Sequence, residues 1–346
     1  MTPKPDAQHR SVDPEPVIEP ELEIIDPHHH LWDLAPQAAS SPFLRGMPFP
    51  RYLLPELLAD VGDGHRVTRT VFVEARAFYR ADGPDELRPV GEVEFANGVA
   101  AMSASGRYGE TQLCAGIVAY ADLTLGGAVV EVLEAARRAA GNRLRGVRMS
   151  AAYDETGSVP TTSAGRGARL YSDDAFRAGF ACLQEYDLSF DAWLFSHQLG
   201  ELVGLAAAFP EQPIVLDHVG TPLGVGVHAG RRVEIYQAWL ASIRQLSRHP
   251  NVHVKLGGLG MSVCGFQFRD PPTSEALAAA WRPYLEPCIE AFGAERCMFE
   301  SNFPVDSETC SYRTLWNALK RIAAGASAEE KASLFSHTAR RFYRLR

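Results

Sequence analysis

Short apolar segments alternate with helix-like stretches along this chain, and this alternation limits its fold more than any other feature. Eight segments are rich in Val, Ile, Leu, Phe and Ala: 24–33, 69–75, 113–118, 144–149, 188–195, 213–218, 252–256 and 297–301. Continuous apolar runs are typical of parallel strands that are buried on both faces. Eight β/α units in 346 residues predict a single-domain α/β protein with the (β/α)8 TIM barrel fold. An open doubly wound sheet is the alternative, but no Gly-rich fingerprint follows any segment.

Residues of helical composition fill most of the intervals between the apolar segments. The expected helices span 55–61, 86–105, 127–140, 173–185, 199–209, 233–248, 275–292, 312–324 and 328–344. The helix over 127–140 is the clearest, because Gly141 and Asn142 follow it as a stop signal. Residues 1–20 are rich in Pro and acids and have no apolar stretch. They predict a disordered tail, without a signal peptide, in front of a barrel over 21–346.

The composition argues against several classes of partner. The net charge is −8 and Lys and Arg form no block, so neither nucleic acid nor a membrane surface is expected as a partner. No run of about 18 apolar residues occurs, and no transmembrane helix is expected. The six cysteines contain no CxxC pair, which favours reduced thiols and a cytoplasmic protein. A small-molecule substrate is therefore the expected partner.

Three consecutive histidines, His28, His29 and His30, end the first apolar segment. Side chains alternate between the two faces of a strand, so His28 and His30 are expected on one side and His29 on the other. Two imidazoles on one face can bind a metal ion or a substrate anion. A tag is the alternative explanation, but tags lie in polar linkers at chain ends, whereas this run follows an apolar strand.

Ionisable residues end most of the other expected strands as well. They are Glu74, Arg148, His197, His218, Lys255 and the two acids of the turn over 300–306, Glu300 and Asp306. In a (β/α)8 barrel the carboxyl ends of the strands meet at one rim, where active sites lie. Any one of these residues could be a satisfied core residue. Their coincidence at one rim is better explained by a shared site, because burying a polar group without a partner is costly.

The motifs at these strand ends resemble the amidohydrolase superfamily. The resemblance is strongest to its amidohydrolase-related subgroup, which includes L-fuconolactonase-like and pyrone-dicarboxylate lactonase-like hydrolases. It runs from about residue 22 to the end of the chain. The matching phrases are Asp26-x-His28-x-His30, Arg145-Gly146-Val147-Arg148, Leu216-Asp217-His218-Val219-Gly220 and Val254-Lys255-Leu256-Gly257-Gly258-Leu259. The resemblance implies that His28, His30 and His197 face a metal or the substrate. It also implies that His218 polarises the scissile carbonyl or positions the water.

The chain departs from the family pattern on its eighth strand. Relatives carry Gly-Ser-Asp-Trp-Pro there, and the Asp ligates the metal or acts as general base. This chain has Glu300-Ser301-Asn302-Phe303-Pro304 instead. The amide of Asn302 cannot accept a proton near neutral pH and is a poor ligand for a divalent cation beside carboxylates. Three alternatives stay open: Glu300 or Asp306 replaces the carboxylate, a histidine acts as base without a metal, or the site has lost its activity.

The resemblance implies a hydrolase that opens a lactone, or a related C–O or C–N bond, in a small carboxylated cyclic substrate. A zinc or manganese ion could activate the water. Without a metal, Arg148 and Lys255 would hold an anionic substrate, unless Arg148 pairs with Glu74 instead. A metal-dependent decarboxylase of an aromatic or unsaturated acid is the alternative enzyme, and a catalytically inactive binding protein is the third hypothesis. The resemblance also suggests a homodimer.

Overall fold

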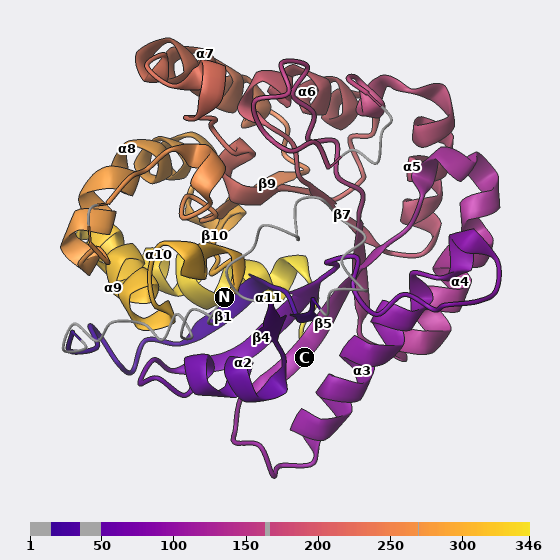
Figure 1. Ribbon diagram of the computed structural model, residues 1–346, viewed down its shortest axis with the longest axis horizontal. Helices are drawn as coiled ribbons and strands as arrows, with labels where there is room; N and C mark the ends of the chain where they lie inside the picture. The colour runs from indigo at the N-terminus through magenta and orange to yellow at the C-terminus, as the bar shows by residue number, and fades with distance from the viewer. Residues whose placement is uncertain (1–14, 35–49, 163–166, 269) are drawn as a thin grey trace, which may run out of the picture.

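The computed structural model describes residues 15–34, 50–162, 167–268 and 270–346. Its main sheet has eight parallel strands whose spatial order is their order along the chain (Figure 1). The strands are β1 (Ile24–His29), β4 (Val67–Val73), β5 (Gln112–Tyr120), β6 (Leu144–Arg148), β7 (Ser189–Ala192), β8 (Ile214–Leu216), β9 (Val252–Leu256) and β10 (Cys297–Phe299). This topology, with helices around the sheet, confirms the predicted (β/α)8 barrel.

The first strand and the segment after the last strand close the barrel. The backbone N–H of Asn302 donates to the carbonyl of His28 at 3.0 Å, and that of His30 donates to Phe303 at 2.7 Å. His29 and Phe303 also form an isolated parallel bridge. The closure therefore places the histidine run directly beside the turn that follows β10.

Helices cover the outside of the barrel and bury one apolar face each. In α4 the buried residues Val129, Val132, Leu133, Ala136 and Ala140 follow the helical period. The helices are α2 (Leu54–Val61), α3 (Val90–Ala104), α4 (Val129–Ala140), α5 (Asp174–Glu185), α6 (Leu199–Ala208), α7 (Arg232–Leu246), α8 (Ser274–Phe292), α9 (Tyr312–Ile322), α10 (Ala328–Ala332) and α11 (Thr338–Phe342). None of the described helices combines the length and hydrophobicity that crossing a membrane requires.

The barrel interior holds its own apolar cluster, separate from the larger one between strands and helices. Strand residues such as Ile25, Val71 and Val118 pack there against Tyr343 and Leu345. The side chain of Arg69 also donates to the carbonyl of the last residue at 3.0 Å. The C-terminal segment therefore fills the end of the barrel where the strands begin, and leaves the opposite end for a site.

Several predicted boundaries differ from those observed. The fifth strand ends at Ala192, the sixth at Leu216 and the eighth at Phe299, each a few residues before the expected end. The sixth strand stops there because His218 and Val219 have left-handed backbones, with φ of 56° and 48°. The expected helix over 328–344 consists of α10, a π-helical turn over 333–337 and α11. A short antiparallel pair, β2 (Trp32–Asp33) with β3 (Arg51–Tyr52), was not predicted.

The expected tail over 1–20 needs a partial correction. Residues 1–14 lie outside the described residues, but residues 15–20 contact the barrel. Glu15 accepts a hydrogen bond from the backbone of Ser274 at 2.7 Å, and the ammonium of Lys320 donates to the carbonyls of Ile18 and Glu19 at 2.9 and 2.8 Å. The packed part of the chain thus begins before residue 21. All six cysteines lie in the described part and are unpaired.

Candidate active site

The histidine run faces both sides of β1, as the alternation predicts. The side chains of His28 and His30 lie together, with their Nε2 atoms 3.2 Å apart. His29 points the other way, where its Nε2 lies 2.9 Å from the hydroxyl of Thr70 and its ring contacts Phe72. His29 therefore belongs to the packing around the barrel, and His28 and His30 belong to the candidate site.

The hydrogen bond of His30 to a backbone carbonyl assigns the proton of its ring. Nδ1 of His30 lies 2.8 Å from the carbonyl of Val73. A carbonyl only accepts, so this nitrogen carries the proton and Nε2 of His30 has the free lone pair. Burial lowers the pKa of His30 well below its usual value, so the ring is neutral. On His28, Nδ1 lies between two groups of opposite charge, 3.0 Å from the ammonium of Lys255 and 2.9 Å from Oε2 of Glu300.

Lys255 lies beneath the histidines and not in the cavity. Its side chain is fully buried, and its ammonium contacts Asp191 at 2.6 Å and Asp217 at 3.0 Å. Burial opposes the charge, but the two carboxylates raise the pKa of Lys255 above its usual value. The geometry does not fit the predicted role of Lys255 in substrate binding. Its ammonium contacts Asp191, Asp217 and His28 instead.

His218 and Glu300 form a buried hydrogen-bonded pair. Oε1 of Glu300 accepts from Nδ1 of His218 at 2.7 Å and from the backbone N–H of His218 at 3.1 Å. Burial by itself would raise the pKa of Glu300, but the imidazoles of His218 and His28 lower it to about 2. Glu300 is therefore an ionised acceptor that keeps the proton on Nδ1 of His218. Nε2 of His218 is then the ring nitrogen that can accept a proton.

Asn302 and Asp306 contact one another on the turn after β10. The Asn302 amide donates to Oδ1 of Asp306 at 2.8 Å, and the backbone of Gly260 donates to Oδ2 at 2.9 Å. Burial raises the pKa of Asp306 to about 7. Asn302 lines the central cavity, and Asp306 lies behind it. Two acids were expected to replace the missing carboxylate. The structure brings Glu300 to His218, whereas Asp306 contacts Asn302 and is separated from the cavity by it.

Arg148 forms a salt bridge with Glu74, which is the alternative to substrate binding that the sequence left open. Nε of Arg148 donates to Oε1 of Glu74 at 2.8 Å, and its NH2 group donates to the backbone carbonyl of Glu74. The remaining NH1 lies 3.4 Å from Nε2 of His28 and 3.6 Å from Asp217. Arg148 lines the cavity but cannot offer a substrate carboxylate the bidentate face that was predicted.

The structure does not bring His197 to this cluster. His197 is exposed, lies 3.0 Å through Nε2 from the carbonyl of Tyr153 and stacks on His228 with ring centroids 6.3 Å apart. It lines a separate cavity with His228, Asp154 and Trp239. The prediction that it joins His28 and His30 is corrected because the fifth strand ends at Ala192. Trp193, directly after that strand, faces the central cavity in its place.

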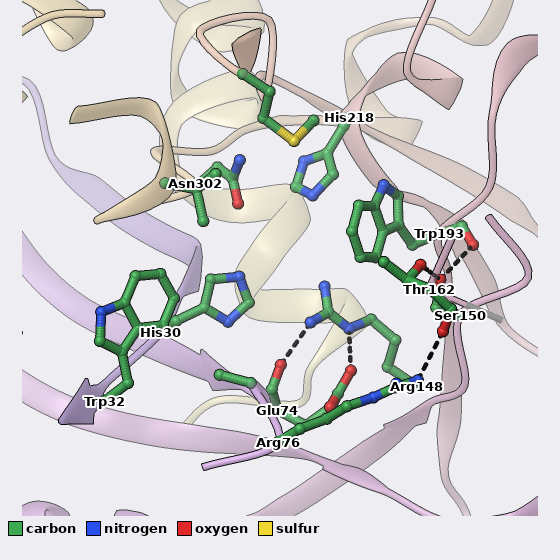
Figure 2. Close-up of a pocket in the computed structure, with 13 residues that line it drawn as sticks. His30, Trp32, Glu74, Arg76, Arg148, Ser150, Thr162, Trp193, His218 and Asn302 are labelled. Carbon is green, nitrogen blue, oxygen red and sulfur yellow. Dashed lines mark hydrogen bonds and ion pairs between the residues drawn. The ribbon is translucent and has the colours of Figure 1, made fainter. Parts of the chain in front are cut away.

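A central cavity of about 50 Å³ lies at the carboxyl ends of the strands (Figure 2). Thirteen residues line it: His30, Trp32, Glu74, Ala75, Arg76, Arg148, Ser150, Thr162, Trp193, His218, Met261, Asn302 and Val305. Trp32 stacks on His30, and Trp193 lies over the guanidinium of Arg148. In Figure 2 the two indoles lie on opposite sides of the space below His218. This shape suits a small ring.

Asp191 and Asp217 were not predicted as part of the site. Both are fully buried and hold Lys255 under His28. The sequence contained a signal for each, because a carboxylate inside an apolar strand needs a partner. Arg76, Ser150, Thr162 and Trp193 were also missed. They follow strand ends, where the turn geometry that aims them is not visible in a residue pattern.

The donor atoms allow a direct test of the expected zinc or manganese ion. The 3.2 Å separation of the His28 and His30 Nε2 atoms suits two ligands of one zinc, which lie about 3.4 Å apart in a tetrahedral site. A catalytic site needs about three protein ligands. Here the Arg148 guanidinium lies 3.4 Å from Nε2 of His28, and a cation beside that atom opposes a metal ion.

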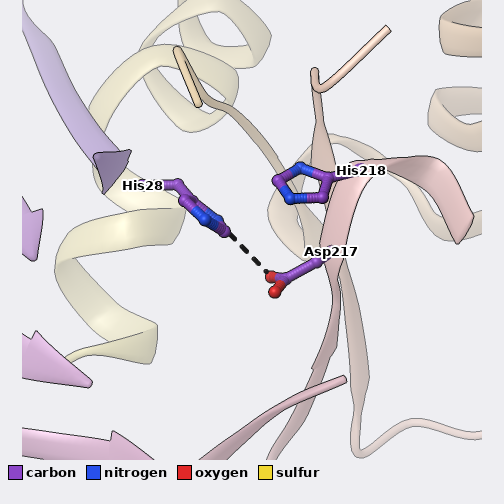
Figure 3. Close-up of side chains that lie close together, drawn as sticks. All are labelled: His28, Asp217 and His218. Carbon is purple, nitrogen blue, oxygen red and sulfur yellow. Dashed lines mark ion pairs between the residues drawn. The ribbon is translucent and has the colours of Figure 1, made fainter. Parts of the chain in front are cut away.

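A second group of candidate ligands, His28, Asp217 and His218, has ligand atoms within 4.8 Å of one another (Figure 3). The ammonium group of Lys255 already lies among these three side chains. The Lys255 ammonium lies 3.0 Å from both Nδ1 of His28 and Oδ1 of Asp217, and it lowers the pKa of Asp217 well below its usual value against the effect of burial. The described residues therefore do not fit a resident metal ion at either place.

Comparisons with known proteins agree with the barrel and its motifs. An uncharacterised protein of Sinorhizobium fredii is 32% identical over 94% of this chain and 99% of its own. An L-fucono-1,5-lactonase of Burkholderia multivorans is 29% identical over 93% of this chain and 96% of its own. A crystal structure of a B. multivorans amidohydrolase with bound zinc shares 26% identity and a TM-score of 0.71, covering 93% of this chain and 99% of that one. The Amidohydrolase family model matches residues 25–345. The chain belongs to the amidohydrolase family and is a hydrolase of its lactonase-like group.

Proposed function

We propose that this protein hydrolyses the ester bond of a small cyclic lactone and that its own side chains perform the reaction without a resident metal ion. The hydrogen bond of 2.7 Å between Nδ1 of His218 and the ionised Glu300 carries this proposal. A carboxylate that fixes one ring nitrogen leaves the other as a general base, as in a Ser-His-Asp triad. This pair supplies the base that Asn302 cannot.

The reaction begins with a water molecule between Nε2 of His218 and the lactone carbonyl carbon. His218 takes a proton from the water, and the water oxygen forms a bond to the carbonyl carbon. Negative charge then develops on the carbonyl oxygen. NH1 of Arg148 is the guanidinium group that Glu74 does not hold, and in Figure 2 it is directed toward the space between His30 and His218. This permanent positive charge stabilises the oxyanion.

The ring opens when the bond between the carbonyl carbon and the ring oxygen breaks. His218 returns its proton to the departing alkoxide, and the product is an open-chain hydroxy acid. Lactones suit such a site because the leaving oxygen is less basic than an amine. The two alternatives from the sequence receive less support. A metal-dependent decarboxylase needs a set of ligands that the described residues do not supply, and an inactive binding protein does not require the ionised Glu300 beside His218.

A panel of five- and six-membered lactones tests the proposal by pH-stat titration of the acid released, in the presence and absence of a strong chelator. We expect turnover of at least one lactone, unchanged after chelation and dialysis. Loss of activity on chelation that zinc or manganese restores would refute the metal-free mechanism. Absence of turnover on every lactone, with release of CO₂ from hydroxybenzoates, would favour the decarboxylase.

A further inference from the structure

Arg76 is a second cation at the central cavity, and its surroundings differ from those of Arg148. It follows β4, is half-buried and lines the cavity. Its NH2 group donates to the carbonyl of Thr162 at 2.8 Å, and its guanidinium carbon lies 5.7 Å from the centre of the Tyr120 ring. These two contacts hold the side chain at the lower edge of the cavity in Figure 2.

Arg76 forms no salt bridge in the described part of the chain. Arg148 has Glu74 at 2.8 Å and Asp217 at 3.6 Å, whereas Arg76 has no acidic group within 4.0 Å among the described residues. A guanidinium that is partly removed from water gains most from a carboxylate or phosphate, which it binds through two parallel N–H groups. The contact to Thr162 uses only one of its donors.

The backbone at Arg76 also favours a positional role. Its φ is 58°, in the left-handed region that favours glycine over residues with a side chain. Such conformations persist where the surroundings impose them, and they are concentrated at binding sites. Here the left-handed turn directly follows Glu74 and Ala75, which also line the cavity. The turn thus aims the Arg76 side chain along the cavity edge.

We propose that Arg76 binds an anionic substituent of the substrate, so that the preferred substrate is a lactone with a carboxylate on the ring. This proposal rests on the proposed function. His218 and Asn302 border the cavity at the top of Figure 2 and Arg76 borders it at the bottom. A ring between Trp32 and Trp193 would direct its carbonyl to His218 and its substituent to Arg76. Recognition of the anion, which the sequence assigned to Arg148 and Lys255, is thereby assigned to a residue that forms no salt bridge among the described residues.

A matched pair of substrates tests the proposal: a six-membered lactone with a ring carboxylate, and its methyl ester at that carboxylate. We expect the wild type to have a kcat/KM at least about 10-fold higher for the acid. Arg76→Gln should lower kcat/KM for the acid by about 10- to 100-fold, the usual effect of losing a charged hydrogen bond, and change the value for the ester by less than about 3-fold. Arg76→Lys should have a kcat/KM for the acid between those of the wild type and Arg76→Gln, because lysine keeps the charge and loses the paired N–H groups of arginine.

Arg80→Gln is the matched control, since Arg80 lies four residues along, pairs with Glu94 on the surface and does not line the cavity. It should leave both values unchanged. Equal losses for acid and ester in Arg76→Gln, or no loss for the acid, would overturn the assignment. Titration calorimetry with tetrahydropyran-2-carboxylate, which cannot be hydrolysed, separates this proposal from the proposed function. Binding that weakens at least about 10-fold in Arg76→Gln supports the anion site even if no lactone is turned over, and unchanged binding overturns it.

Discussion

Oε1 of Glu300 accepts hydrogen bonds from both the ring and the backbone of His218, at 2.7 and 3.1 Å. The two residues are 82 positions apart in the chain and meet because β8 and β10 both lead into the same rim. The double contact fixes the orientation of the imidazole as well as its tautomer. In the proposed mechanism this carboxylate, two residues before Asn302, prepares His218 as the base.

Replacing Glu300 with Gln should remove the carboxylate that fixes the tautomer of His218, while the size and shape of the side chain stay the same. The amide can offer its NH2 group to Nδ1 of His218 and so stabilise the wrong tautomer. We expect kcat on a hydrolysed lactone to fall by about 10²- to 10⁴-fold, with an unchanged circular dichroism spectrum. Glu295→Gln changes an exposed acid just before the same strand and should keep full activity. A kcat for Glu300→Gln within about 3-fold of the wild type would argue against the base assignment.

His197 and His218 should behave differently when each is replaced with Asn. The resemblance implied that His197 faces a metal or the substrate, and in that place His197→Asn would lower kcat by orders of magnitude. The structure places His197 on His228 in a separate cavity, so we now expect a change in kcat of less than about 3-fold, because no reacting group lies there. His218→Asn should lower kcat by at least about 10². Steady-state kinetics of the two variants on one lactone decides between the assignments, and a large loss in both would restore His197 to the site.

Asn302→Asp should lower the stability of the protein, and more so at high pH. The new carboxyl would lie against Asp306, whose pKa is already raised to about 7 by burial. An acid with a folded pKa above its unfolded value of about 3.9 contributes less stability as pH rises through that interval. The pair can share one proton at pH 5 and not at pH 8. We expect the Tm deficit relative to wild type to be at least about 2 °C larger at pH 8 than at pH 5.

The control for this variant is Asn302→Ala, which removes the same amide without adding charge. Loss of the amide that donates to Asp306 also raises the pKa of Asp306, but without a second carboxylate the pH dependence of the Tm deficit should be smaller than in Asn302→Asp. Elemental analysis of the same samples is informative too, because the substitution restores a carboxylate that could ligate a metal. Equal Tm deficits of Asn302→Asp at the two pH values would show that the carboxyl does not face Asp306.

Lys255→Met should destabilise the fold strongly, since it leaves Asp191 and Asp217 buried without their cation. Breaking a buried ion pair by removing one partner costs about 3–5 kcal/mol in the free energy of unfolding. Lys331→Met removes a lysine that pairs with Glu19 near the surface and should cost less than about 1 kcal/mol. Urea denaturation of both variants gives the comparison. A loss below about 1 kcal/mol for Lys255→Met would mean that the ammonium is not required beneath His28.

Much of the site could be predicted from local sequence. The alternation of a strand places His28 and His30 on one face and His29 on the other, and no tertiary information is needed for this. The same period could not place Glu300 and Asn302, because the eighth strand ends at Phe299 and Asn302 has a left-handed backbone. The apolar segments between helical stretches are enough to predict eight parallel strands, because each pattern reports the burial of its own element.

Residue patterns did not reveal which groups neutralise one another. Arg148, Lys255 and His197 are equally good candidates in the sequence, since each follows or ends an apolar strand. In the structure Glu74 holds Arg148, two aspartates hold Lys255, and an early strand end carries His197 out of the cluster. Local sequence thus determined the strands, the barrel and the histidine pair. Only the closure of the barrel decided which of these residues face the cavity, because counterions that lie far apart in the chain become neighbours only when all eight strands meet at one rim.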